Sequence, residues 1–134
     1  MTNIKVIAFD ADDTLWVNEP YFREAEDKFC ALLEDYLPLH STANALFKTE
    51  VANLPLYGYG IKGFMLSMIE TILEVTQGTA SLAMIAKAIE FGKEQLNKPV
   101  ELLNGVEEVL AALKGDYRLV VATKGDLLDQ ERKL

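Results

Sequence analysis

Two short apolar runs lie near opposite ends of the chain. Ile4–Phe9 (IKVIAF) stops at a group of acidic residues, and Tyr117–Ala122 (YRLVVA) stops at a polar cluster, TKGD. Apolar residues at nearly every position are typical of strands buried on both faces, as in parallel sheets. Because more than 100 residues separate the runs, there is room for the long crossover that a parallel pair needs. We therefore expect an α/β fold.

The stretch between the two runs has helical periodicity. Apolar residues recur at three- and four-residue spacing in four segments, which predicts four helices. A shorter helix is expected over Val106–Leu113, with Gly115 as its C-terminal cap. The four segments run from Asn18–Pro20 to Pro38, from Ser41 or Thr42 to Pro55, over Phe64–Leu73 and ending by Gly78, and from Ser81 to Pro99.

Composition and charge restrict the kind of partner. The chain has 134 residues, a net charge of −8 and 50% hydrophobic residues, which is ordinary for a globular protein. A negative surface repels the phosphate backbone, so neither nucleic acid nor an anionic membrane is an expected partner. No apolar run approaches the roughly 18 residues that cross a bilayer. The single cysteine, Cys30, fits a reducing compartment, so we expect a cytoplasmic protein.

An acidic loop follows the first apolar run. Asp10, Asp12, Asp13 and Thr14 (DADDT) stand at the carboxyl end of the expected strand, the edge at which α/β sheets bind ligands. Neighbouring carboxylates repel each other unless a cation lies between them, and Mg²⁺ prefers such oxygen ligands. The alternative is a turn and capping cluster, since Asp and Thr favour loops.

A calcium loop of the EF-hand type does not fit this segment. Counted from Asp10, the sixth position is Leu15, where that loop needs Gly, and the twelfth is Tyr21, where it needs Glu.

At this point the sequence resembles the haloacid dehalogenase superfamily. VIAFDADDTLW is similar to its motif I, a hydrophobic strand followed by Asp-x-Asp-x-Thr, with Asp10, Asp12 and Thr14 in the three places. VVATKGD is similar to motif II, a hydrophobic strand that ends in Thr or Ser, here Thr123. The helical stretch between them resembles the cap inserted after motif I.

The resemblance implies a division into two domains. Residues 1–17 and 100–134 would form part of a Rossmann-like hydrolase core with a parallel sheet, and residues 18–99 would form a helical-bundle cap.

The resemblance also implies roles for individual residues. Asp10 would be the nucleophile that forms an aspartyl-phosphate, and Asp12 the general acid and base. The implied cofactor is Mg²⁺, held by the Asp10 side chain and the Asp12 backbone carbonyl. Thr123 and Lys124 would bind phosphate, although Lys124 also fits a solvated loop lysine. Asp12 favours a phosphatase acting on a small phosphorylated metabolite, because an alkoxide leaving group needs a proton and a halide does not.

The chain departs from the family pattern after motif II. Only eleven residues follow Thr123, so the lysine of motif III and the acidic pair of motif IV are missing. We interpret the chain as a truncated phosphatase, inactive or weak by itself. Two strands cannot be covered on both faces, so we expect an exposed apolar core surface and self-association. The alternatives are a 2-haloacid dehalogenase, a catalytically dead fragment that binds Mg²⁺ or phosphate, and a helical module that binds a protein partner.

A glycine pattern lies inside the helical stretch. Gly58, Gly60 and Gly63 match G-x-G-x-x-G, but the preceding NLPLY is not a strand, as dinucleotide binding would require. A hinge or a cap loop over the active site is the preferred interpretation. Trp16 fits either the core or a substrate entrance, and Cys30 fits the core better than a nucleophile.

Overall fold

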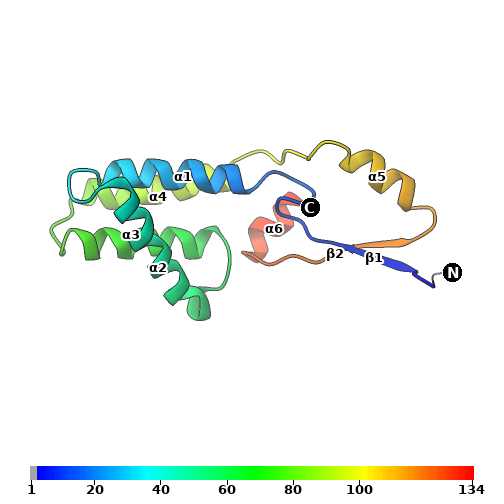
Figure 1. Cartoon of the computed structure of the whole chain (residues 1–134), viewed down its shortest axis with the longest axis horizontal. Helices are drawn as coiled ribbons and strands as arrows, with labels where there is room; N and C mark the ends of the chain where they lie inside the picture. Colours follow the sequence, from blue (N-terminus) through cyan, green and yellow to red (C-terminus); the bar gives the residue numbers. More distant parts are fainter. Residues whose placement is uncertain (1–2) are drawn as a thin grey trace. The chain divides into compact units, whose positions relative to one another are not determined.

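The computed structural model describes residues 3–134, and its eight elements follow the predicted order of strand, helices, strand and helix (Figure 1). In chain order they are β1 (Val6–Phe9), α1 (Glu19–Leu32), α2 (Leu39–Tyr57), α3 (Ile61–Val75), α4 (Leu82–Leu96), α5 (Val106–Leu113), β2 (Arg118–Val121) and α6 (Leu127–Lys133). In the described part of the chain, no helix has both the length and the apolar character needed to cross a bilayer.

The elements fall into two compact units. The strand unit contains the residues up to Pro20 together with Pro99–Thr123, and the helical unit contains Tyr21–Lys98 together with Lys124–Leu134. Residues 124–134, which we expected to group with the strands, therefore group with the helices. The assignment of the two units to a hydrolase core and a cap stays a prediction.

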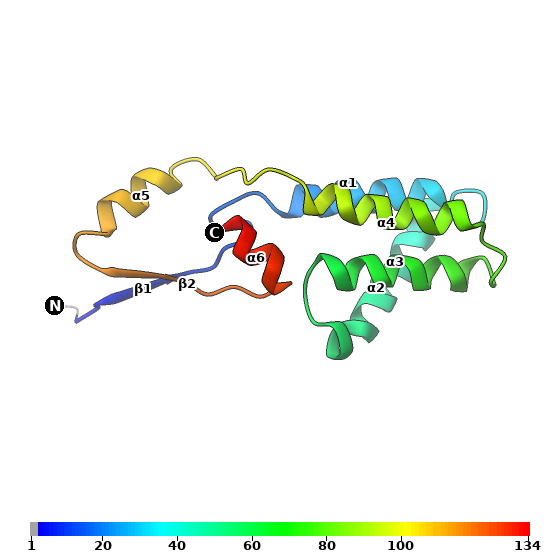
Figure 2. The ribbon, with the colours of Figure 1, turned by 180° about the vertical axis from the view of Figure 1, so that it is seen from behind.

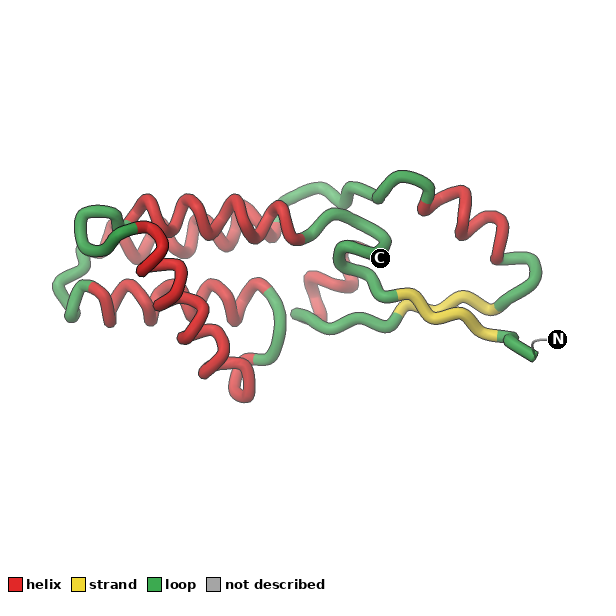
Figure 3. Tube along the Cα trace, viewed as in Figure 1, coloured by secondary structure: helices red, strands yellow, loops and turns green. Residues whose placement is uncertain are grey.

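The strand unit is built on one parallel pair. β1 and β2 lie side by side (Figures 2 and 3). They pair from Val6 opposite Arg118 to Phe9 opposite Val121. The expected burial on both faces is not observed, since Val6 is 50% and Val121 is 41% exposed. Each strand has one neighbour in the described sheet, so part of its apolar surface has nothing to pack against. The exposed apolar surface that we expected is present, whereas self-association stays a prediction.

The helical unit has its own apolar core. The packed helices are held by side chains that the periodic pattern places on one face of each. Phe22 of α1 meets Phe64 of α3 edge to face, with ring centroids 5.2 Å apart and an interplanar angle of 71°. The buried core residues are Ala25, Phe29, Leu33, Leu46, Phe64, Met68, Ile72 and Ala88.

Charged residues link α1 and α4 at the surface of this unit. The Lys28 ammonium lies 3.3 Å from a carboxylate oxygen of Glu24 and 3.0 Å from one of Glu94. Lys98 lies 3.1 Å from Glu24. These pairs are partly exposed, so each contributes little to stability by itself.

Several predicted helix ends are wrong. α1 ends at Leu32 and does not reach Pro38. α2 continues past Pro55 to Tyr57 and ends at Gly58, whose φ of 70° lies outside the helical region. Pro55 lies in the last turn of α2, which ends two residues later at Tyr57. Gly115 does not cap α5: Lys114 does, in right-handed helical conformation, so no left-handed residue is needed at that end. The predicted start of the fourth helix at Ser81 is confirmed: α4 begins at Leu82, and the Ser81 side chain caps it by accepting a hydrogen bond from the Met84 amide.

Candidate active site in the strand unit

Strand pairing places the two motif segments at one edge of the sheet. Phe9 and Val121 are register partners, and the amide of Ala122 donates to the carbonyl of Phe9 at 2.8 Å. Asp10 and Thr123 therefore follow the carboxyl ends of adjacent parallel strands. The edge that binds ligands in α/β sheets thus carries a carboxylate from one strand and a hydroxyl from the other.

A tight turn directly after β1 holds the acidic loop. The Ala11 carbonyl accepts hydrogen bonds from the amides of Thr14 at 3.1 Å and Leu15 at 2.8 Å. Ala11, Leu15 and Trp16 are buried and form the apolar centre of this unit. Asp13 and Thr14, which lie between these buried residues, are exposed, and Asp12 is half-buried.

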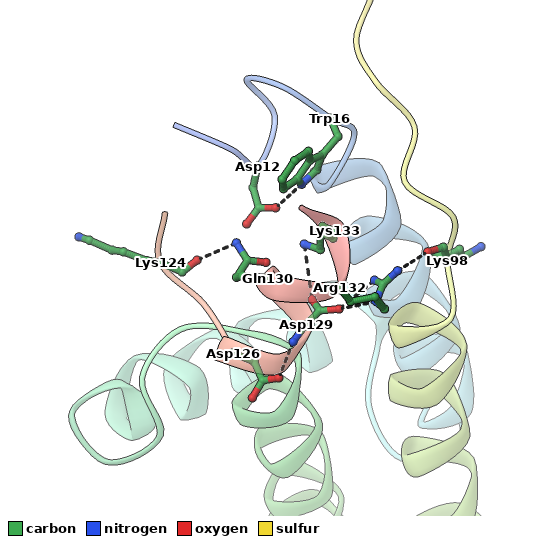
Figure 4. A network of polar contacts seen from close by, with 9 residues as sticks. All are labelled: Asp12, Trp16, Lys98, Lys124, Asp126, Asp129, Gln130, Arg132 and Lys133. Atoms are coloured by element: carbon green, nitrogen blue, oxygen red, sulfur yellow. Dashed lines mark hydrogen bonds and ion pairs between the residues drawn. The ribbon is translucent and has the colours of Figure 1, made fainter. Parts of the chain in front are cut away.

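Asp12 is anchored by the tryptophan that follows it. The indole N–H of Trp16 donates to Oδ1 of Asp12 at 2.9 Å (Figure 4). Trp16 is only 4% exposed. Of the two positions considered for it, the core and a substrate entrance, it therefore occupies the core. A buried ring that holds one carboxylate oxygen limits the rotamers of Asp12.

Asp10 lies at the surface of the loop. Its Oδ2 accepts a hydrogen bond from the Thr14 hydroxyl at 3.3 Å, and the residue is exposed. The threonine of the Asp-x-Asp-x-Thr pattern thus contacts the first aspartate of the same pattern. The Asp10 carboxylate is therefore accessible to a ligand that arrives from solvent.

Asp13 has a structural role at the start of α1. Its backbone has a φ of 60°, and its Oδ1 accepts from the amides of Asn18 and Glu19, both at 2.9 Å. The side-chain acceptor at the start of α1 is therefore Asp13. A positive φ is tolerated by Asp more readily than by most residues, and that signal was available in the sequence.

The two predicted phosphate-binding residues are held differently. Thr123 is half-buried and ends the strand unit. The backbone of Lys124 is fixed in the helical unit, where its carbonyl accepts from the side-chain amide of Gln130 at 3.3 Å (Figure 4). Its ammonium lies 5.2 Å from the ring centroid of Tyr59. The structure thus shows where each residue is anchored and leaves their joint action on a ligand as a prediction.

The oxygen donors at the loop match the chemistry of a hard cation. Asp10 and Asp12 offer carboxylate and carbonyl oxygens, and Mg²⁺ is commonly bound by one or two carboxylates with waters and substrate oxygens completing its shell. Among residues 3–134, no cluster of three or more His, Cys, Asp or Glu side chains is arranged to hold a metal ion.

Cys30 is excluded as a reactive thiol by its surroundings. It is buried in α1, and burial, followed by the charges of Glu26 and Asp27, raises the pKa of its thiol. A thiolate is disfavoured there, which agrees with the core position that we expected.

Comparison with known proteins identifies the same family as the two motifs. The model of the haloacid dehalogenase-like hydrolases matches residues 4–134. The chain is 45% identical to a haloacid dehalogenase-like family hydrolase from Xanthomonas campestris, with a TM-score of 0.90 over 97% of this chain and 55% of that one. A predicted phosphoglycolate phosphatase from Haemophilus somnus is 21% identical, with a TM-score of 0.52 over 96% of this chain and 55% of that one. The latter likeness concerns the fold alone. No curated protein matches the chain.

Proposed function

Since the chain belongs to the haloacid dehalogenase-like hydrolases, we propose that it carries the nucleophile and phosphate contacts of a Mg²⁺-dependent phosphomonoesterase acting on a small phosphorylated metabolite. The observation that carries the proposal is the parallel pairing of β1 with β2, which puts Asp10 and Thr123 at one sheet edge. The chain spans 55% of the length of both solved structures, so the activity proposed is that of the whole enzyme.

The proposed reaction has two displacements at phosphorus. An oxygen of the Asp10 carboxylate attacks the phosphoryl group, the bond from phosphorus to the leaving oxygen breaks, and Asp12 gives its proton to that oxygen. Water then attacks the acyl phosphate while Asp12 takes a proton from it. The bond between phosphorus and Asp10 breaks, which releases inorganic phosphate and restores the carboxylate.

Two hydrogen bonds support these roles. The Trp16 indole orients the carboxylate of Asp12, and the Thr14 hydroxyl orients that of Asp10. Thr123 would donate its hydroxyl to a phosphate oxygen, and Lys124, the next residue, would offset phosphate charge. When bound, Mg²⁺ would supply further offset of the repulsion between the Asp10 carboxylate and the anionic substrate. We assign the helical unit to the cap in this scheme.

The experiment is hydrolysis of p-nitrophenyl phosphate by a full-length version of the enzyme, as wild type and as Asp10→Asn, with Mg²⁺ and with EDTA. We expect activity that EDTA removes and that Asp10→Asn reduces to background, because an amide is not a nucleophile here. Asp116→Asn, an exposed aspartate in the turn before β2, is the matched control and should keep full activity. Asp12→Asn should lower kcat by about 10²–10⁴.

The result that would contradict the assignment is hydrolysis that survives in Asp10→Asn. Halide release from a 2-haloacid, without phosphate release, would favour the dehalogenase alternative. A hydroxylamine-sensitive phosphoenzyme formed by the wild type and absent in Asp10→Asn would identify the acyl phosphate directly.

A further inference from the structure

The helical unit carries a polar groove between α2 and α3, hereafter the α2–α3 groove. Its volume is about 610 Å³, which is within the range of sites that bind small molecules. Each lining residue belongs to one of these two helices, so the groove lies within the helical unit. Its α2 wall recurs at three- and four-residue spacing from Ser41 to Asn53, which is the pattern of a single helix face. Because most of the lining side chains are hydroxyls, amides or charged groups, the groove suits a polar ligand.

Two carboxylates form the α3 wall of the groove. Glu70 and Glu74 are four residues apart, so they share a helix face on which like charges are unfavourable. The Glu70 carboxylate is held from two sides, since Oε1 accepts from the Tyr57 hydroxyl at 3.1 Å and Oε2 accepts from the side-chain amide of Asn53. Both donors are neutral. They therefore fix the orientation of Glu70 without neutralising its charge.

Lys48 supplies the opposite charge from the α2 wall. Within residues 3–134 its ammonium forms no ion pair, not even with Glu70 or Glu74 in the same groove. The Glu74 side chain likewise has no hydrogen-bond or ion-pair partner in the described part of the chain. Opposite charges that line one groove beyond ion-pair distance of each other leave room for a ligand that pairs with both.

Neutral polar groups complete the lining. The Thr49 hydroxyl donates to the carbonyl of Ala45 at 3.0 Å, so its oxygen can still accept a hydrogen bond from a ligand. The side-chain amide of Asn44 can both donate and accept. The groove can therefore satisfy an ammonium and a carboxylate with more than charge alone.

We propose that the α2–α3 groove binds a small zwitterion with one ammonium and one carboxylate, the chemistry of a free amino acid. The ligand ammonium pairs with Glu70 and Glu74, and its carboxylate pairs with Lys48, through charge-assisted hydrogen bonds. A simple cation leaves Lys48 unpaired, and a simple anion meets two carboxylates, so both bind more weakly. The inference does not depend on the proposed function, because every group in it belongs to the helical unit.

The test is a titration of the isotope-labelled 134-residue chain, followed by the NMR shifts of its backbone amides. The probes are glycine, β-alanine, γ-aminobutyrate and δ-aminovalerate, zwitterions in which the two charges lie progressively further apart. Butylamine and butanoate each carry one of the charges. At least one zwitterion should saturate the shifts of amides in α2 and α3, and should bind about tenfold more tightly than either single-charge probe.

Variants assign the two charges. Lys48→Met and Glu74→Gln each remove one charge with little change of shape, and each should weaken zwitterion binding about tenfold to a hundredfold. Lys48→Met should leave butylamine binding unchanged, whereas Glu74→Gln should weaken it. The matched controls are Lys87→Met and Glu90→Gln, at an exposed ion pair on α4 that does not line the groove, and both should bind like the wild type.

The absence of a saturable shift with all of the zwitterions would overturn the inference, and so would shifts confined to helices other than α2 and α3. Equal affinities for butylamine and for the tightest zwitterion would remove Lys48 from the site and overturn it too. A loss in the α4 controls as large as that in Lys48→Met would assign the binding to general surface charge. Hydrolysis of p-nitrophenyl phosphate tests the proposed function separately, since none of these titrations involves phosphate.

Discussion

Glu50 provides a test of the helical unit that does not depend on catalysis. It lies on α2, and its partial burial, followed by the charge of Glu26, raises the pKa of its carboxyl to about 7. The reference value is 4.5, and the unfolded chain titrates near it. The folded protein therefore holds the proton more tightly than the unfolded chain, so the free energy of unfolding falls as pH rises from about 4.5 to about 7 and stays low above that.

The size of the stability effect follows from the rise in the pKa of Glu50. At about 1.36 kcal/mol for each pKa unit, a rise from 4.5 to about 7 has a ceiling of about 3.4 kcal/mol. The carboxyl is partly exposed and solvent screens it, so we expect about 1–2 kcal/mol. Glu50→Gln keeps the shape and removes the charge, and it should raise the free energy of unfolding by that amount at pH 8 and by much less at pH 5.

The assay is urea unfolding followed by far-UV circular dichroism at both pH values. Glu34→Gln, an exposed glutamate beyond the end of α1, is the matched control and should change stability little at either pH. Glu26→Gln should produce part of the gain at pH 8, because it removes the second cause of the raised pKa. Equal gains at pH 5 and pH 8, or no gain at pH 8, would refute the reasoning, since the predicted effect exists only while Glu50 is charged.

Other predictions concern packing and association. Both amide atoms of Gln95 are buried without a hydrogen-bond partner, so Gln95→Met should raise stability by about 1–3 kcal/mol in urea unfolding, and a loss would mean that the amide is satisfied. Met68 is fully buried, so Met68→Ala should lower stability by about 2–5 kcal/mol in the same assay. Because Val6 and Val121 are largely exposed on the strand pair, we expect the 134-residue chain to associate in size-exclusion chromatography with light scattering. A clean monomer would count against this association.

Much of the fold could be predicted because its signals are local. The apolar runs give two strands close to the observed Val6–Phe9 and Arg118–Val121, since a strand with few polar positions is identified from neighbouring residues alone. Helical spacing likewise predicts the helices between them. The start of a helix at Ser81 could be predicted because a serine hydroxyl in that place reaches an amide only three residues away, a distance that sequence spacing determines.

The misplaced ends and caps have a different origin. Pro55 stops a helix only when the chain has a better conformation available, and here the last turn of α2 accommodates it. Asp13 acts as the acceptor for α1 because the turn around Ala11 brings it back to Asn18 and Glu19. No count of residue spacing shows that return of the chain.

The sequence by itself determined the order of the elements and the residue types of the candidate site, because periodicity and the Asp-x-Asp-x-Thr pattern are properties of adjacent positions. Only the tertiary structure decided which distant groups meet. It placed Gly60 against the backbone of Asp126, gave Tyr59 to Lys124, and put Glu50 where burial and Glu26 disfavour its charge. Such contacts join residues far apart in the chain, and their energies depend on distance and burial, which do not exist until the chain has folded.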